Sequence, residues 1–135
     1  MERNPDEWEQ AVALLSSTME KCERMQLKFP EGTSQHTLLK NRIKALQISK
    51  ALLTIDQAAR FASEELKQAL PPVVSIIDKT TKAQSKHEKG SAKYKQYETL
   101  IRTMEIAKAV IEGRIMENGF TMMGGESSGQ DEYKT

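Results

Sequence analysis

Residues 43–53 read IKALQISKALL, and residues 101–111 read IRTMEIAKAVI. The two stretches lie 58 positions apart, and the same shift aligns residues 9–53 with residues 67–111 without a gap. Eleven of the 45 aligned positions are identical, and a glycine-containing turn coincides in both copies. A repeat of this length corresponds to one supersecondary unit. The sequence therefore predicts a chain built from two tandem copies of one unit.

Each copy has the pattern of a helical hairpin. Apolar residues in the first copy recur at helical spacing, as at Trp8, Val12 and Leu15. Gly32 then suits the left-handed position that ends a helix, and the hydroxyl of Thr33 or its neighbour can cap the next helix. The second copy repeats this pattern after the 58-residue shift. No stretch alternates with period two, so we expect no strands.

The predicted fold is all-α. Two tandemly duplicated hairpins, at about residues 5–54 and 55–117, most simply form a four-helix bundle with approximate twofold internal symmetry. Pro71-Pro72 is expected to kink or restart the third helix. Residues 1–120 would then form one domain, and residues 121–135 a disordered polar tail rich in glycine and serine.

The boundaries of the later helices are less strongly specified. Thr54-Ile55-Asp56-Gln57 has the pattern of a capping box, which would open a new helical segment. The sequence leaves open whether the second and third helices are separate or form one long bent helix. Asn118-Gly119 is expected to end the last helix.

Composition argues against several functional classes. The 135-residue chain carries 20 basic and 19 acidic residues, and a net charge of +1 gives no strong attraction to nucleic acid or anionic lipid. A lone cysteine, Cys22, excludes an internal disulfide, and neither His36 nor His87 lies in a Glu-x-x-His pattern. We therefore expect no catalytic residue, cofactor or metal. No apolar run approaches the length of a membrane span, and no signal sequence is visible, which predicts a cytoplasmic protein without membrane contact.

Surplus apolar residues suggest an interface. The ends of the second and fourth helices are apolar on more than one face, which indicates either central burial or a second contact surface. The candidate interface residues are Ile48, Ala51, Leu52, Ile106, Ala109 and Val110. The alternative is that residues 55–70 fold back and cover them.

Polar residues inside the apolar stripes form a second candidate. Gln26 and Gln84 occupy matching positions in the first and third helices, and Lys50 and Lys108 in the second and fourth. Converging buried polar groups would bind an anion or a small metabolite. The simpler interpretation is that the stripes fray at the hairpin turns and that lysines extend their head groups into solvent.

Lysines form the third candidate, a basic patch at Lys82, Lys86, Lys89 and Lys93, flanked by Lys79, Lys95, Tyr94 and Tyr97. Such a patch could bind phosphates, although the near-zero net charge argues against nucleic acid as the partner. The favoured hypothesis is therefore a non-enzymatic, adaptor- or inhibitor-like protein-interaction module that forms a homo-oligomer or binds a protein partner. A ligand-binding bundle and nucleic-acid binding are the alternatives.

Overall fold

The computed structural model describes residues 5–54 and 61–126 of the chain. These residues form four helices: α1 (Pro5–Gln26), α2 (Ser34–Leu53), α3 (Ser63–Gln84) and α4 (Ala92–Glu126). No strand occurs within the described ranges, so the expected all-α class is confirmed there. None of the helices in these ranges is long and apolar enough to cross a membrane.

The helix starts have local causes that are visible in the sequence. Pro5 opens α1 with Asp6 and Glu7 in its first turn, where proline lacks a needed donor and carboxylates face the positive end of the helix dipole. Thr33 caps α2, because its Oγ1 accepts a hydrogen bond from the backbone N–H of His36 at 3.2 Å. The cap that the sequence predicts for the second helix is therefore present.

The backbones of the two hairpin turns match at each position after the 58-residue shift. Gly32 and Gly90 have φ of +94° and +88°, a backbone conformation that glycine adopts at little cost. Ser91 Oγ accepts from the N–H of Tyr94 at 3.2 Å, as Thr33 does in the first hairpin. The bounds of α1, shifted by 58, are those of α3, and α2 and α4 begin at matching positions. Positions 58 apart are called twin positions below.

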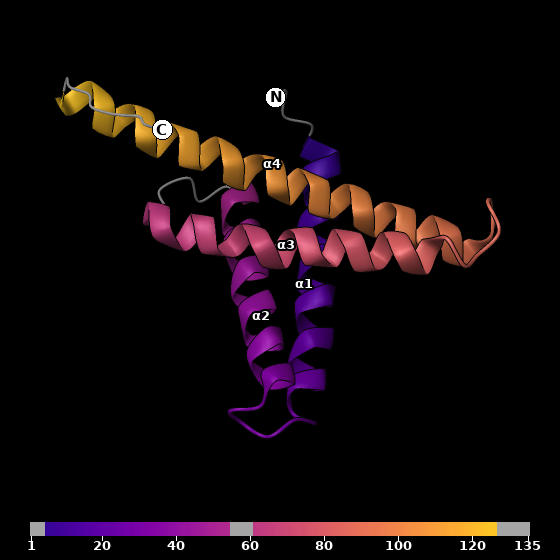
Figure 1. The fold of residues 1–135 in the computed structure, drawn as a ribbon. Helices are drawn as coiled ribbons and strands as arrows, with labels where there is room; N and C mark the ends of the chain where they lie inside the picture. The colour runs from indigo at the N-terminus through magenta and orange to yellow at the C-terminus, as the bar shows by residue number, and fades with distance from the viewer. Residues whose placement is uncertain (1–4, 55–60, 127–135) are drawn as a thin grey trace.

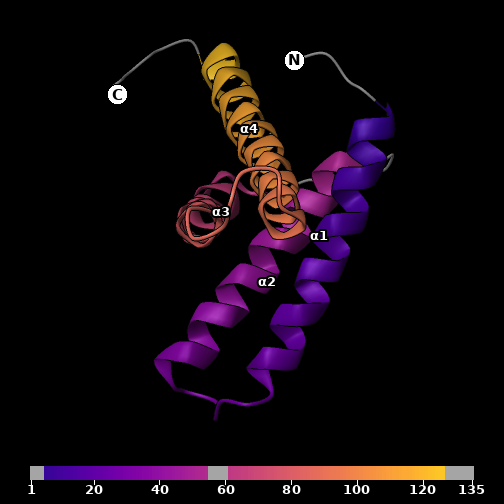
Figure 2. The same cartoon turned by 90° about the vertical axis from the view of Figure 1, so that its right-hand side faces the viewer.

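The hairpins cross instead of lying side by side. In Figure 1 the α1–α2 hairpin stands upright, and the α3–α4 hairpin runs across it. Figure 2, turned by 90°, views α3 nearly along its axis while α1 and α2 are seen along their length. Within the described residues α1 does not approach α3, whereas α2 contacts all three other helices. The expected bundle of roughly aligned helices is therefore not confirmed.

One apolar core lies where the hairpins meet. Its most enclosed large side chains are Leu15, Leu46, Leu66, Met104 and Ile111, and Leu46 and Met104 are twins with no exposed surface. The core is aliphatic, as the low aromatic content requires. Both hairpins contribute to it, so neither buries its apolar stripe alone.

Two expected helix boundaries differ from the structure. α3 runs through Pro71 and Pro72 as one helix, so the expected restart is not found and the kink is not confirmed. The carbonyls that lose their donors belong to Lys67 and Gln68, both exposed residues, where water can replace the missing N–H groups. α4 does not end at Asn118-Gly119 but continues to Glu126.

Asn118 links α4 to the start of α3. Its amide Nδ2 donates to the carbonyl of Phe61 at 3.3 Å and to Ser63 Oγ at 3.4 Å. Glu65 Oε1 accepts from the N–H of Ala62 at 3.1 Å at the same end of α3. The capping box expected at 54–57 lies largely outside the described residues, as does most of the tail; residues 121–126 belong to α4.

Candidate docking groove between α1 and α4

The crossing of the hairpins creates two equivalent helix pairs, α1 with α4 and α3 with α2. Each pair carries one ion pair at twin positions. Glu7 Oε2 lies 2.8 Å from Arg102 Nε, and Glu65 Oε2 lies 3.5 Å from Lys44 Nζ. Both pairs are substantially exposed, so each contributes at most about 1 kcal/mol to stability. The two ion pairs show which points of the two crossings correspond, because they lie at twin positions.

The two crossings differ in how tightly they close. α2 and α3 approach each other along more of their length than α1 and α4 do. Beside the Glu65–Lys44 pair about 50 Å³ remains open, lined by Ile48, Ala69 and their neighbours, and a separate hollow of about 520 Å³, lined by Asn41, Gln68, Pro72 and their neighbours, lies farther along the same crossing. The twin position beside the Glu7–Arg102 pair opens into a hollow of about 860 Å³. This hollow is the α1–α4 groove.

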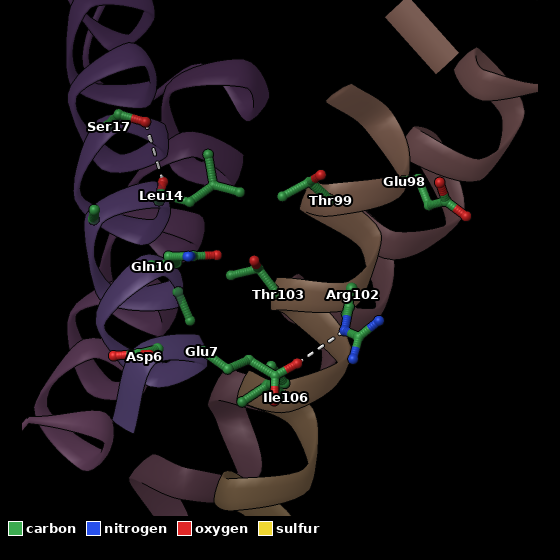
Figure 3. Close-up of a pocket in the computed structure, with 12 residues that line it drawn as sticks. Asp6, Glu7, Gln10, Leu14, Ser17, Glu98, Thr99, Arg102, Thr103 and Ile106 are labelled. Carbon is green, nitrogen blue, oxygen red and sulfur yellow. Dashed lines mark hydrogen bonds and ion pairs between the residues drawn. The ribbon is translucent and has the colours of Figure 1, made fainter. Parts of the chain in front are cut away.

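Figure 3 shows how the groove is built. α1 forms one wall and α4 the other, and the Glu7–Arg102 ion pair joins the walls at one end. Gln10 and Leu14 extend from α1 toward α4, which presents Thr99 and Thr103. The lining residues are Asp6, Glu7, Gln10, Ala11, Ala13, Leu14, Ser17, Glu98, Thr99, Arg102, Thr103 and Ile106. Three of the seven lining residues on α1, namely Ala11, Ala13 and Ser17, have small side chains.

The groove has buried residues at its base and charged residues around its rim. Ala11 and Thr103 are buried in its base, while Leu14 and Ile106 are half-buried on its walls. Hydroxyls on α1 bond within the helix, as Ser17 Oγ donates to the carbonyl of Leu14 at 3.2 Å. Three carboxylates and one guanidinium stand around the rim, so the groove is acidic overall.

The six predicted interface residues differ in burial and in the helices that they face. Ile48 is 3% exposed and Leu52 is 8% exposed, and Ile48 faces Ala69 on α3. The alternative in which residues 55–70 cover the second helix therefore holds for Ile48, because α3 begins within that segment. Ala51, Ala109 and Val110 are partly buried. Of the six predicted residues, Ile106 lines the groove.

The predicted polar residues are not brought to one place. Gln26 and Gln84 lie at the tips of different hairpins, which point to separate ends of the molecule (Figure 1). Each amide donates to the first turn of the following helix: Gln84 to the carbonyl of Tyr94 at 3.2 Å, and Gln26 to that of His36 at 3.5 Å. Each glutamine thus links the end of the first helix of its hairpin to the start of the second helix. Lys50 and Lys108 are both half-buried.

The predicted basic patch is exposed at the α3–α4 tip. Lys82, Lys86, Lys89 and Lys93 are all exposed there. The rings of His87 and Tyr97 lie 5.6 Å apart between centroids, and Lys93 Nζ stands 6.0 Å from the centre of the Tyr97 ring. The patch therefore combines ammonium groups with aromatic faces.

Cys22 is buried in α1, as its place on the apolar stripe predicts. Burial raises the pKa of its thiol, while the nearby guanidinium of Arg42 acts in the opposite direction. The thiolate, which is the nucleophilic form, is thus disfavoured. Among the described side chains, no cluster of three or more histidine, cysteine or acidic residues could hold a metal ion.

Sequence reasoning did not identify the α1–α4 groove, although a signal was available. Gln10, Ala11 and Ser17 are identical to their twins Gln68, Ala69 and Ser75, and all three line the groove while their twins line the α2–α3 crossing. Gln10 and Ser17 are not core residues, so their identity to their twins indicates a shared contact. The pattern could not reveal that the α2–α3 crossing closes around Ile48 while the α1–α4 crossing stays open at Ile106. No known protein family, curated protein sequence or solved structure matches the chain.

Proposed function

We propose that the protein is a non-enzymatic, adaptor- or inhibitor-like interaction module that receives an amphipathic helix of another protein in the α1–α4 groove. The observation that carries the proposal is the difference between Ile48 and its twin Ile106 at the two crossings. The α2–α3 crossing is filled at Ile48, whereas Ile106 lines a hollow of about 860 Å³. A partner helix would cover Ile106 as α3 covers Ile48.

The charge on the rim indicates the chemistry of the partner. Asp6, Glu7 and Glu98 outnumber Arg102, and Glu7 already pairs with Arg102. A helix with lysine or arginine beside a narrow apolar strip would complement this rim, and charge complementarity of this kind favours correct orientation and fast association. The apolar strip would lie on Leu14 and Ile106.

Duplication supplies the origin of the groove in this proposal. We infer that both hairpins descend from one ancestral hairpin that paired with a copy of itself. Supporting this are the matching helix bounds, the twin caps at Thr33 and Ser91, and the twin ion pairs. Once both copies lay in one chain, each crossing was free to diverge, and only the α2–α3 crossing is closed around the isoleucine that both copies share.

A photo-crosslinking experiment in the native cell tests the groove. Benzoylphenylalanine replaces Thr99 in the α1–α4 groove or, as a matched control, its exposed twin Asn41, which lines the smaller hollow of about 520 Å³ at the α2–α3 crossing. We expect a discrete heavier adduct from position 99 and much less from position 41. Glu98→Lys should reduce the adduct, whereas Lys40→Glu, the twin substitution, should not. Equal labelling at 41 and 99 would contradict the proposal.

The same experiment separates a second copy from another protein. An adduct of twice the chain's mass would assign the groove to self-association. The homo-oligomer expected from the sequence was motivated partly by Ile48 and Leu52, which now lie inside the fold. Light scattering on the purified protein tests that expectation against the monomer mass of 15.2 kDa.

A further inference from the structure

The two hairpin tips have the same backbone but different surfaces. The α3–α4 tip, residues 78–95, carries six lysines against Asp78 and Glu88, a net charge of +4. The twin tip, residues 20–37, carries three basic and three acidic residues and is neutral. The first is called the basic tip and the second the neutral tip. Because turn geometry and caps are shared, folding alone does not require the lysines of the basic tip.

An exposed aromatic ring, His87, lies among the lysines of the basic tip, and Tyr97 lies beside the tip on α4. His87 is exposed and packs at 5.6 Å between ring centroids against Tyr97, with the planes tilted by 42°. Lys93 Nζ approaches the Tyr97 ring at 6.0 Å. The twin positions of His87 and Tyr97 hold Phe29 and Leu39. The exposed ring of His87 therefore offers a stacking face among ammonium groups.

Apolar side chains show the opposite distribution. On or beside the neutral tip, Met25, Leu27 and Leu38 are 47%, 88% and 39% exposed. Their twins are Ala83, Ser85 and Gln96. The basic tip thus lacks the large apolar groups with which a protein inserts into a lipid surface. An acidic polypeptide would use the lysines but has no need of a stacking face.

We propose that the basic tip binds single-stranded nucleic acid, with its lysines on the phosphates and the His87–Tyr97 ring pair stacking a base. Unpaired bases expose their faces, and aromatic stacking beside a cationic surface is the general means of binding such strands without sequence preference. This surface lies at the end of the α3–α4 hairpin, away from the tip of the α1–α2 hairpin (Figure 1). The activity is independent of the groove function proposed above.

The expected binding is weak and strongly dependent on salt. If the net charge of +4 neutralises about four phosphates, the logarithm of the association constant falls with a slope of about −3 against the logarithm of salt concentration. Affinity should therefore fall by about 50-fold between about 50 and 200 mM salt. The near-zero charge of the whole chain does not oppose this, because screening restricts the interaction to about 10 Å at 0.1 M salt.

Fluorescence anisotropy with the full chain and a labelled single-stranded oligonucleotide of about 12 nucleotides tests the proposal. The variant Lys79→Glu/Lys82→Glu/Lys86→Glu should lose at least about tenfold in affinity at low salt. The control Lys21→Glu/Arg24→Glu/Lys28→Glu carries the same charge change at the twin positions, which are also exposed, and should change affinity less than about threefold. Circular dichroism and urea unfolding verify that both variants fold.

A second variant separates stacking from simple charge attraction. His87→Ala should weaken oligonucleotide binding about three- to tenfold, while leaving any binding to labelled polyglutamate unchanged. The proposal is overturned by absence of binding at low salt, a flat salt response, equal losses in the two triple variants, or polyglutamate binding as tight as that of the oligonucleotide. Tighter binding to vesicles containing phosphatidylserine would likewise overturn it in favour of a lipid surface.

Discussion

The difference between the two crossings can be measured with one twin pair of substitutions, Ile48→Lys and Ile106→Lys. The residues are identical, lie 58 positions apart and belong to matching helices. Ile48 is 3% exposed against α3, whereas Ile106 is half-buried on the wall of the α1–α4 groove. The structure therefore predicts unequal costs for the same chemical change.

The expected losses in the free energy of unfolding follow from how deeply each isoleucine is buried. Ile48→Lys loses about 2 kcal/mol of apolar transfer free energy. Its ammonium must also lose hydration or push α2 away from α3, which adds about 1–3 kcal/mol. At Ile106 the lysine stem can follow the groove wall and keep its head group in water, so the expected cost is about 1 kcal/mol. For a chain of this size these values correspond to losses in melting temperature of about 10–20 °C and about 3–5 °C.

Urea unfolding, followed by circular dichroism and by fluorescence of Trp8, the single tryptophan, measures both costs. Ile48→Val and Ile106→Val serve as controls, each expected to cost about 1 kcal/mol or less. Losses for the two lysine variants that agree within about 1 kcal/mol, or a larger loss at position 106, would refute the unequal closure of the crossings. The proposal that the groove binds a partner helix would then fail as well.

Three further predictions concern the tips and the buried thiol. Gly32→Ala and Gly90→Ala should each lower the free energy of unfolding by about 1–2 kcal/mol in urea titrations, because both need positive φ while no atom lies within 4 Å of the added methyl group. Gln84→Ala should cost more than Gln26→Ala, up to about 1 kcal/mol, because its hydrogen bond is shorter, 3.2 Å against 3.5 Å; a larger loss at Gln26 would contradict this. Since burial raises the pKa of the Cys22 thiol, the thiol ionises first in the unfolded chain, so the contribution of Cys22 to stability should be constant below about pH 8.5 and be lost as the pH rises above it; in unfolding titrations the stability of Cys22→Ala should fall less over that range than that of the wild type.

Local structure was predictable because its causes are local. Helical spacing of apolar residues, the glycine of each turn and the capping hydroxyls act within a few residues, so the hairpins and both turns could be derived from the sequence. The repeat gave further support, since Gly32 and Gly90 have the same need for positive φ. The expected end of the last helix was wrong, because Asn118-Gly119 lies inside α4.

The candidate sites were only partly predictable. The basic patch lies exposed as expected, because solvation of lysine is a local preference. The interface residues were identified as surplus apolar surface, but a helical wheel cannot tell whether another segment of the same chain covers them. α3 covers Ile48, and the groove lies at its twin Ile106.

Two similar helical hairpins, with their caps, turns and aliphatic stripes, could be derived from the sequence, because those features depend on spacing and on the preferences of single residues. The packing of the hairpins could not: that they cross, that Ile48 is covered while Ile106 lines a groove, and that the two tips point to separate ends of the molecule are visible in the fold alone. The physical reason is that a crossing angle depends on how two side-chain surfaces fit together. Twin positions in a repeat are equivalent in the chain, but they need not be equivalent in their packing.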